Sequence, residues 1–276
     1  MNTSSHASIT GNLRNFLILI AIFFVLARFG DVYFLFDLIN HCKPVLFLLY
    51  GVLFGLLYYI QPIKINLLFI ILGILVNWGT IPIHSGFTYQ ENDSTVSLLH
   101  FNLLVDNEKI EDVLTLVTSM NPDIVSFQEA SFWWSKKLQK GLPQYYFVCH
   151  ELDTPFGICV ASKDRPKKEQ VFFVQNPNLP SILIETTVQK TPVTMVFTHP
   201  KPPFTQPFFT SRNSHFEKLT KRLQGTENLI VIGDLNCTQW SPVYQMFVGE
   251  LGLKNTLTAR DNTWPTKSII PFLQLD

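Results

Sequence analysis

The sequence lacks several features that define common protein classes. Its 21 Lys and Arg are balanced by 21 Asp and Glu, and from residue 84 onward 17 Lys and Arg stand against 19 Asp and Glu. This excludes the overall basic excess that is usual in a dedicated nucleic-acid-binding protein. The four cysteines, Cys42, Cys149, Cys159 and Cys237, have no CxxC spacing. The usual zinc and redox motifs are therefore absent, and no disulfide can be assigned.

Charge is scarce in the N-terminal third of the chain. Between Leu13 and Ile83 there are four Lys and Arg and two Asp, set among three apolar runs, Phe16–Ala27, Val45–Ile60 and Ile65–Val76. None of the runs has a charged face at helical spacing, which argues against core helices of a soluble protein. None carries a charge in its middle, which argues against a transport path. We therefore predict a membrane anchor over residues 1–83, with three short spans at about 13–29, 44–60 and 65–82.

Two further points concern the membrane. Val25-Leu26-Ala27 would be acceptable as a signal-peptide cleavage site, but the next two runs would still hold the protein in the bilayer. Residues 83–100 contain no Lys or Arg, and low positive charge is typical of segments outside the cytoplasm. We expect the bilayer to be a partner of the chain, and the remaining domain to lie on the non-cytoplasmic side.

From Val96 the pattern becomes that of a separate α+β domain, preceded by a polar linker at 84–95. Alternation and helical spacing predict strands and helices in turn, which indicates sheets covered by helices. The predicted strands are Val96–Phe101, Ile124–Phe127, Gln144–Cys149, Gly157–Ala161, Gln170–Val174, Ser181–Thr187, Val193–Thr198 and Leu229–Ile232, and Ile269–Leu275 is expected to be the approach to a final strand. The predicted helices cover about 110–120, Ser131–Lys140 and Ser211–Leu223, and another begins at Ser241-Pro242. Leu229–Ile232, with four apolar residues in a row, is expected to be buried on both faces.

Polar side chains follow four of these strands. Asn102, Glu129, His199 and the pair Asp234 and Asn236 each lie at the C-terminal side of an apolar run, where side chains can converge at one edge of a sheet. A carboxylate with an amide nearby suits an oxygen-ligated cation such as Mg²⁺, and His, Asp and Asn suit proton transfer and contact with phosphate oxygens. Each residue also has an ordinary structural interpretation, as a turn former, a helix N-terminal acid or a loop histidine.

Seven motifs occur in an order that resembles a known superfamily. They are HFNLL (100–104), PDIVSFQEA (122–130), FGICVASK (156–163), THPKPP (198–203), SRNSHF (211–216), VIGDLNCTQWSPVY (231–244) and TWP (263–265). Together they resemble the endonuclease/exonuclease/phosphatase superfamily, and bacterial members with a multi-span N-terminal anchor are the most similar. The resemblance implies a deoxyribonuclease-I-like fold, a four-layer α/β/β/α sandwich over 96–276, and a place in the bacterial inner membrane.

The resemblance also implies roles for individual residues. Glu129 corresponds to a metal ligand and Asn102 to the amide of the metal site, with Mg²⁺ as the cation and Mn²⁺ as the alternative. Asp234 corresponds to the group that activates the attacking water, Asn236 to a phosphate contact, and His199 to the histidine on the leaving-group side. Arg212 either reaches the phosphate or lies on a solvated helix face. The implied activity is metal-assisted hydrolysis of a phosphodiester, in nucleic acid or in phospholipid; no protein partner can be predicted.

One departure from the superfamily pattern concerns the last residue, Asp276. It aligns with the Asp of a terminal Asp-His pair, and the His and the closing strand that would follow are absent. We assign Asp276 to the catalytic set as the residue that would orient this His. The sequence is then either a fragment or a truncated gene product. The absent His supports the alternative that the chain is a catalytically impaired relative, which acts as a membrane-tethered binding or scaffold module.

Overall fold

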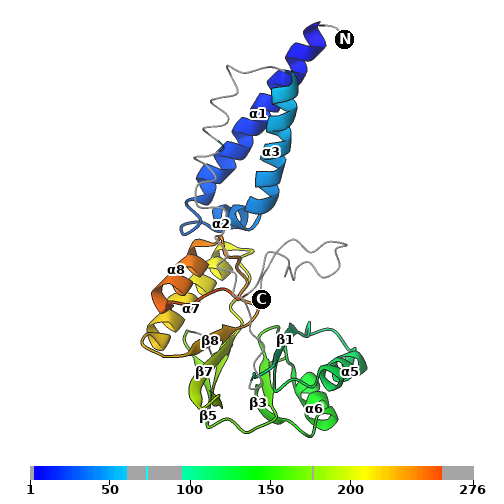
Figure 1. Cartoon of the computed structure of the whole chain (residues 1–276), viewed down its shortest axis with the longest axis vertical. Helices are drawn as coiled ribbons and strands as arrows, with labels where there is room; N and C mark the ends of the chain where they lie inside the picture. The colour runs from blue at the N-terminus through cyan, green and yellow to red at the C-terminus, as the bar shows by residue number, and fades with distance from the viewer. Residues whose placement is uncertain (1–2, 61–72, 74–94, 176, 257–276) are drawn as a thin grey trace. The chain divides into compact units, whose positions relative to one another are not determined.

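The computed structural model describes residues 3–60, 73, 95–175 and 177–256 (Figure 1). The chain divides into two compact units. The first comprises Met1–Ser85, Pro203–Phe209 and Cys237–Gln245, and the second comprises Gly86–Pro202, Thr210–Asn236 and Met246–Asp276. Two short segments from the C-terminal part of the chain therefore fold with the N-terminal helices, and one boundary falls between Asn236 and Cys237.

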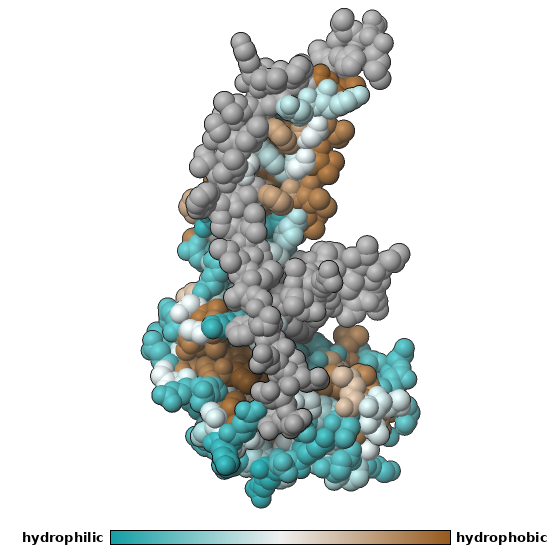
Figure 2. Space-filling model, in the orientation of Figure 1, coloured by the Kyte–Doolittle hydropathy of each residue, from teal (hydrophilic) through white to brown (hydrophobic). Residues whose placement is uncertain are grey.

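The first unit contains helices α1 (Thr3–Ala27), α2 (Phe34–His41) and α3 (Lys43–Ile60). Helices α1 and α3 lie side by side and bury a cluster that includes Leu17, Phe24 and Leu57 (Figure 1). Hydrophobic side chains also cover much of their outer surface (Figure 2). Two segments, Ser8–Ala27 and Lys43–Ile60, are long and apolar enough to cross a membrane, a criterion that a signal sequence or a soluble core helix also meets.

The first two predicted spans thus correspond to helices. The predicted third span at 65–82 lies outside the described residues except for Gly73, and so does most of the predicted linker at 84–95.

Helix α2, which the apolar pattern did not predict, is inverted relative to an ordinary surface helix. A surface helix of a soluble protein buries its apolar stripe. In α2 the buried side chains are Asp37, Asn40 and His41, spaced so that they share one face, while Leu35 is exposed. Asn40 donates to the carbonyl oxygen of Ala27 at 2.9 Å, which ties α2 to the end of α1.

The second unit contains two four-stranded mixed sheets. The first has the order β1-β2-β4-β3 and the second β5-β6-β7-β8. The strands are β1 (Leu98–Asn102), β2 (Ile124–Gln128), β3 (Tyr146–His150), β4 (Ile158–Ser162), β5 (Lys168–Phe173), β6 (Pro180–Val188), β7 (Thr191–Thr198) and β8 (Leu229–Ile232). The helices are α5 (Ile110–Met120), α6 (Phe132–Gly141), α7 (Gln206–Leu223) and α8 (Pro242–Leu251), of which α7 and α8 begin in the first unit. Within these residues β1 pairs parallel with β2 and β7 parallel with β8, while the other pairs are antiparallel.

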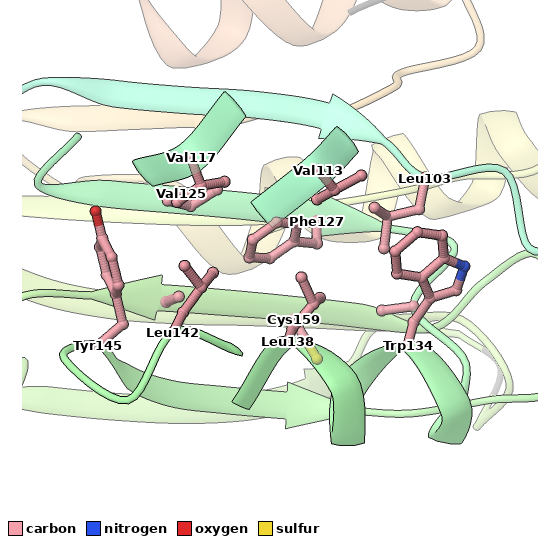
Figure 3. Packing of buried hydrophobic residues seen from close by; sticks show 12 residues of the cluster. Leu103, Val113, Val117, Val125, Phe127, Trp134, Leu138, Leu142, Tyr145 and Cys159 are labelled. Carbon is pink, nitrogen blue, oxygen red and sulfur yellow. The ribbon is translucent and has the colours of Figure 1, made fainter. Parts of the chain in front are cut away.

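Alternating side chains of β2 and β4 pack into two different hydrophobic clusters, because successive side chains of a strand point to opposite faces of the sheet. Val125, Phe127 and Cys159 point into a cluster with α5 and α6, where Trp134 and Leu138 are fully buried (Figure 3). Their neighbours along the strands face the second sheet. That inter-sheet cluster contains Ile124, Ile158, Val160, Ile182, Ile184, Met195 and Phe197. The two sheets therefore pack face to face, with α5 and α6 on the outer side of the first.

Helix α7 packs on the outer side of the second sheet through a buried polar contact. His215 Nε2 lies 2.8 Å from Thr198 Oγ1, which lies 2.8 Å from Ser181 Oγ on β6. Arg222 stacks over the ring of Phe172 on β5, 4.2 Å from its centroid. The predicted sandwich of two sheets with outer helices thus agrees with the described residues.

Two predictions at the strand and helix level were wrong. Strand β8 is not buried on both faces: Ile230 is 43% exposed, because β8 pairs only with β7 in the described part of the chain and lies at the edge of its sheet. Helix α7 begins at Gln206, five residues before the predicted Ser211. The proline-rich loop ends earlier than expected because Pro207 is accommodated in the first turn, where its missing N–H costs nothing.

A disulfide that the sequence left undecided links the two strands at one edge of the first sheet. Cys149 on β3 and Cys159 on β4 are directly paired, with their Cα atoms 4.1 Å apart. Cysteine spacing alone could not identify this pair, because it depends on the register of two strands. Cys42 and Cys237 carry thiols.

The lowered pKa of His215 predicts that the fold is less stable in acid. Burial, and to a lesser extent His199, lower the pKa of His215 from 6.5 to about 4. Between these two values the unfolded chain binds the proton and the folded chain does not, so the free energy of unfolding falls as pH drops from 6.5 towards 4. The expected loss is on the order of 3 kcal/mol. Urea unfolding at several pH values checks this. His215→Asn should flatten the dependence while His150→Asn preserves it; equal slopes in all three proteins would refute the assignment.

Removing the Cys149–Cys159 disulfide should lower the free energy of unfolding by roughly 2–4 kcal/mol, because the unfolded chain regains the freedom of a closed loop. Denaturation of a Cys149→Ser, Cys159→Ser double variant measures this, with Cys42→Ser as the control. Thiol titration of the denatured, non-reduced wild type should find two thiols, Cys42 and Cys237. Finding four would contradict the disulfide.

Candidate active site

The carboxyl ends of strands from both sheets meet at one place in the second unit. Asn102 ends β1, Glu129 follows β2, His199 follows β7 and Asp234 follows β8 after one glycine. The amide nitrogen of Asn102 donates to Glu129 Oε1 at 2.8 Å and to Asp234 Oδ2 at 3.4 Å. Two carboxylates from different sheets are therefore held on either side of one carboxamide.

Glu129 is fixed by its backbone as well as by its partners. It has a positive φ of 59°, uncommon for a residue with a side chain, and such conformations are enriched at functional sites. Its second carboxylate oxygen, Oε2, accepts the backbone N–H of Val105 at 2.9 Å. Both oxygens thus accept hydrogen bonds, and the half-buried carboxylate has a defined orientation.

Gln128, whose role sequence reasoning missed, joins the two sheets behind the site. Its side chain is fully buried. Nε2 donates to the carbonyl oxygen of Thr198 at 2.7 Å, and Oε1 accepts the backbone N–H of Asp234 at 2.7 Å. One carboxamide on β2 thereby holds the ends of β7 and β8. A glutamine at the end of a buried and mainly apolar strand was the signal that could have identified it.

Gly233 permits this close approach. It has a φ of 154°, and a Cβ at this position would collide with the carbonyl oxygen of Thr198 and come within 2.6 Å of Gln128 Nε2. A residue with a side chain would push apart the strand ends that carry Asp234 and His199.

Asp234 and Asn236 form a turn that is held by hydrogen bonds within the turn and to neighbouring segments. Asp234 Oδ1 accepts the backbone N–H of Asn236 at 3.1 Å, an Asx-type contact. Asn236 has a φ of 49°, and its amide nitrogen donates to the carbonyl oxygen of Pro200 at 2.9 Å. Arg212 is fully buried and donates from Nη1 to the backbone oxygen of Asn236 at 3.1 Å. The solvated-face interpretation of Arg212 was therefore wrong.

His199 lies beside Asp234 in a nearly closed environment. Its Nε2 is 3.8 Å from Asp234 Oδ2, close enough for an ion pair when the ring is protonated. The side chain is 3% exposed, and its ring lies against that of Phe156 with the centroids 5.5 Å apart. His199 is thus held at the same strand edge as the two carboxylates.

The structure brings together Asn102, Glu129, His199, Asp234 and Asn236, as the positions of these residues after the strands indicated. Asp276, the remaining predicted site residue, lies outside the described residues, as do the TWP motif and Ile269–Leu275, the expected approach to a final strand.

Glu129 and Asp234 are the candidate ligands of the predicted magnesium ion. The described residues contain no group of three or more His, Cys, Asp or Glu side chains arranged to hold a metal. Mg²⁺, however, is commonly bound by one or two carboxylates and keeps several waters, so Glu129 and Asp234 suit it. Asn102 presents its amide nitrogen to both carboxylates, and its Oδ1 accepts the N–H of Leu104 at 2.9 Å. In this orientation Asn102 positions the carboxylates.

Several solved structures are similar to this chain in fold. The D. rerio TDP2 structure with a single-strand DNA product shares 14% identity with the chain, with a TM-score of 0.50, over 65% of this chain and 79% of that one. A β-hairpin deletion mutant of Staphylococcus aureus beta toxin shares 18% (TM-score 0.48; 62% and 78% covered), and the human Nocturnin catalytic domain with bound sulfate 17% (0.46; 55% and 69%). These similarities concern the fold alone.

No curated protein sequence matches the chain. The sequence profile described as "Endonuclease/Exonuclease/phosphatase family" matches residues 99–276, which is more than half of the chain and includes every residue of the site. Members of this family are generally phosphoesterases that use divalent metals. The chain belongs to the endonuclease/exonuclease/phosphatase family.

Proposed function

We propose that the protein is a membrane-anchored, Mg²⁺-dependent phosphodiesterase. The observation that carries this proposal is the placement of Glu129 and Asp234, from two different sheets, on either side of the Asn102 amide. Two carboxylates that share one amide donor repel each other, and a cation bound beside them would relieve this repulsion. A phosphodiester substrate would bring further negative charge to the site. The arrangement therefore suits a reaction in which a divalent cation and an anionic substrate bind together.

Each candidate site residue would have its own role in the hydrolysis of the phosphodiester. A bound Mg²⁺ would neutralise phosphate charge and polarise the reacting phosphoryl group. Glu129 would hold the cation, and Asn102 would keep the Glu129 carboxylate in place. Asp234 would orient a water and accept its proton as the water attacks phosphorus. Asn236 and His199 would contact the phosphate and the departing oxygen. Asp276, by the family pattern, would belong to the same catalytic set.

A lipid phosphodiester is the substrate class we favour over nucleic acid. Leu104, whose N–H is bonded to Asn102, is 55% exposed, and Phe132, three residues after Glu129, is 60% exposed. Apolar side chains next to a phosphate site suit acyl chains, and the domain lacks the overall basic excess that would attract a nucleic-acid backbone.

The membrane part of the proposal rests on the two apolar helices and on the disulfide. Ser8–Ala27 and Lys43–Ile60 are the candidate spans. Disulfides such as Cys149–Cys159 form and persist in oxidising compartments, which supports a catalytic domain outside the cytoplasm, as the lack of Lys and Arg in residues 83–100 also does.

Conservative changes to the carboxylates test the activity. Asp234→Asn should lower kcat for bis-p-nitrophenyl phosphate about 10²- to 10⁴-fold, because the proton acceptor is lost. Glu129→Gln should raise the Mg²⁺ concentration needed for half-maximal rate. Phospholipid vesicles and single-stranded DNA, assayed in parallel, distinguish the substrate classes. The controls are Asp164→Asn and Glu111→Gln, which make the same changes at exposed positions. If wild type and site variants share one EDTA-insensitive background, the proposed activity is wrong.

Membrane association makes a separate prediction. The full chain should remain in the membrane fraction after washing with alkaline carbonate, because two apolar helices hold it there. In bacterial cells expressing the protein, external protease should cleave the domain once the outer membrane is opened. Protection of the domain in spheroplasts, with cleavage only after lysis, would place it in the cytoplasm instead.

A further inference from the structure

Helix α6, which begins three residues after Glu129, has one buried and one exposed face. Trp134 and Leu138 are fully buried against the first sheet and α5 (Figure 3). Ser131 caps the start of the helix, because its Oγ accepts the backbone N–H of Trp134 at 3.3 Å. Since Ser131 is only two residues from Glu129, the first turn of α6 is held next to the candidate site.

The exposed face of α6 combines aromatic and cationic side chains. The rings of Phe132 and Trp133 are 60% and 42% exposed. Three exposed lysines follow, and α6 contains no Asp or Glu. Spacings of one, four, five and eight residues from Phe132 place all these side chains on one side of the helix. We call this surface the α6 face; its residues are Phe132, Trp133, Lys136, Lys137 and Lys140.

Trp133 is held in place by its neighbours on the helix. Its ring contacts the ring of buried Trp134 edge to face, with the centroids 5.1 Å apart. Lys137 Nζ lies 5.8 Å from the centroid of the Trp133 ring, within the range of a cation–π contact. A Trp ring with an ammonium group beside it suits the boundary between water and lipid, where the ring leaves water while the ammonium group stays hydrated.

An anionic bilayer fits this combination better than a nucleic acid does. Aromatic rings and lysines also occur where single-stranded nucleic acids stack, but such binding relies on an extended basic surface. From residue 84 onward, 17 Lys and Arg stand against 19 Asp and Glu. The positive charge of α6 is instead local, and it complements the negative charge of phospholipid headgroups. The candidate spans Ser8–Ala27 and Lys43–Ile60 would give the same chain a bilayer as its partner.

We propose that the α6 face is an interfacial surface that binds an anionic phospholipid bilayer. The Phe132 and Trp133 rings enter the boundary between headgroups and acyl chains, and the three lysines contact headgroup phosphates. Because α6 starts next to Glu129, this contact brings the phosphodiesters of the bilayer to the candidate site. The effect on the rate of lipid hydrolysis rests on the proposed phosphodiesterase function, whereas the binding itself does not.

The test uses the full chain in lipid nanodiscs, made of phosphatidylcholine alone or mixed with phosphatidylglycerol. A nitroxide label is attached through Phe132→Cys in a Cys42→Ser, Cys237→Ser background, in which the remaining native cysteines form the disulfide. Asp164→Cys carries the control label, because Asp164 is exposed and follows β4 at the end of the first sheet opposite to Glu129. Collision rates of each label with oxygen, which concentrates in lipid, and with a water-soluble nickel chelate are compared.

In nanodiscs with phosphatidylglycerol, the label at 132 should collide mainly with oxygen and the label at 164 mainly with nickel. Reversing the charge of Lys136, Lys137 and Lys140 to Glu should lower the ratio of bound to unbound α6 face about 10²-fold, as expected for three lysines at an anionic surface. Trp133→Ala should weaken binding without a change of charge. The matched control reverses three exposed lysines away from α6 and should resemble the wild type: Lys190→Glu, Lys218→Glu and Lys221→Glu.

Activity supplies a separate readout. In the α6 lysine variant and in Trp133→Ala, the rate of phosphatidylglycerol hydrolysis should fall about tenfold more than the rate for soluble bis-p-nitrophenyl phosphate, because only the bilayer substrate requires interfacial binding.

The outcomes separate the inference from the proposed function. If no phosphodiester is hydrolysed but the label at 132 contacts lipid, the proposed function fails and the interfacial surface stands. If the label at 132 remains as accessible to nickel as the label at 164, the inference is wrong. Equal lipid contact in both nanodiscs, unaffected by the lysine reversal, would refute an anionic surface as the partner. Immobilisation of the label by added single-stranded DNA, without lipid contact, would assign the α6 face to nucleic acid and also overturn the proposal.

Discussion

The site depends on one buried carboxamide. Gln128 holds the end of β7 through the Thr198 carbonyl and the end of β8 through the Asp234 N–H, while the residue after it is Glu129. Both sheets therefore share a single fixed point, and the distance between their carboxylates follows from it. A buried amide with both of its polar ends bonded adds specificity, since any shift of one sheet against the other would leave a donor or an acceptor unpaired.

Much of the domain could be predicted from local sequence because its strands and helices have clear periods. Helix α5 was expected over 110–120 and is found at Ile110–Met120, where apolar spacing and the following Asn121-Pro122 define both the helix and its end. The convergence of the candidate site residues could be predicted by position because each follows a strand. The exposure of β8 could not, because an apolar run does not tell whether a strand lies inside a sheet or at its edge.

What sequence could not predict depends on contacts between distant residues. The positive φ of Glu129 and of Asn236 is imposed by neighbouring strands and loops, and neither residue type requires it. Arg212 could have been read as solvated because its partner, the Asn236 backbone oxygen, lies 24 positions away. Helix α2 was not predicted because an apolar pattern indicates only helices that bury apolar side chains in a bilayer or a core. The buried side of α2 is polar.

The inverted helix α2 bears on how such a protein could arise and vary. The family match begins at residue 99, yet two of the segments inside it, Pro203–Phe209 and Cys237–Gln245, fold with helices that precede it. In this chain the part that matches the family model is thus not separable from the N-terminal helices by a cut at residue 99. An exchange of N-terminal helices between relatives would have to keep Asp37 and His41, which contact Ser241 and Thr238, so these four positions are expected to vary together in evolution.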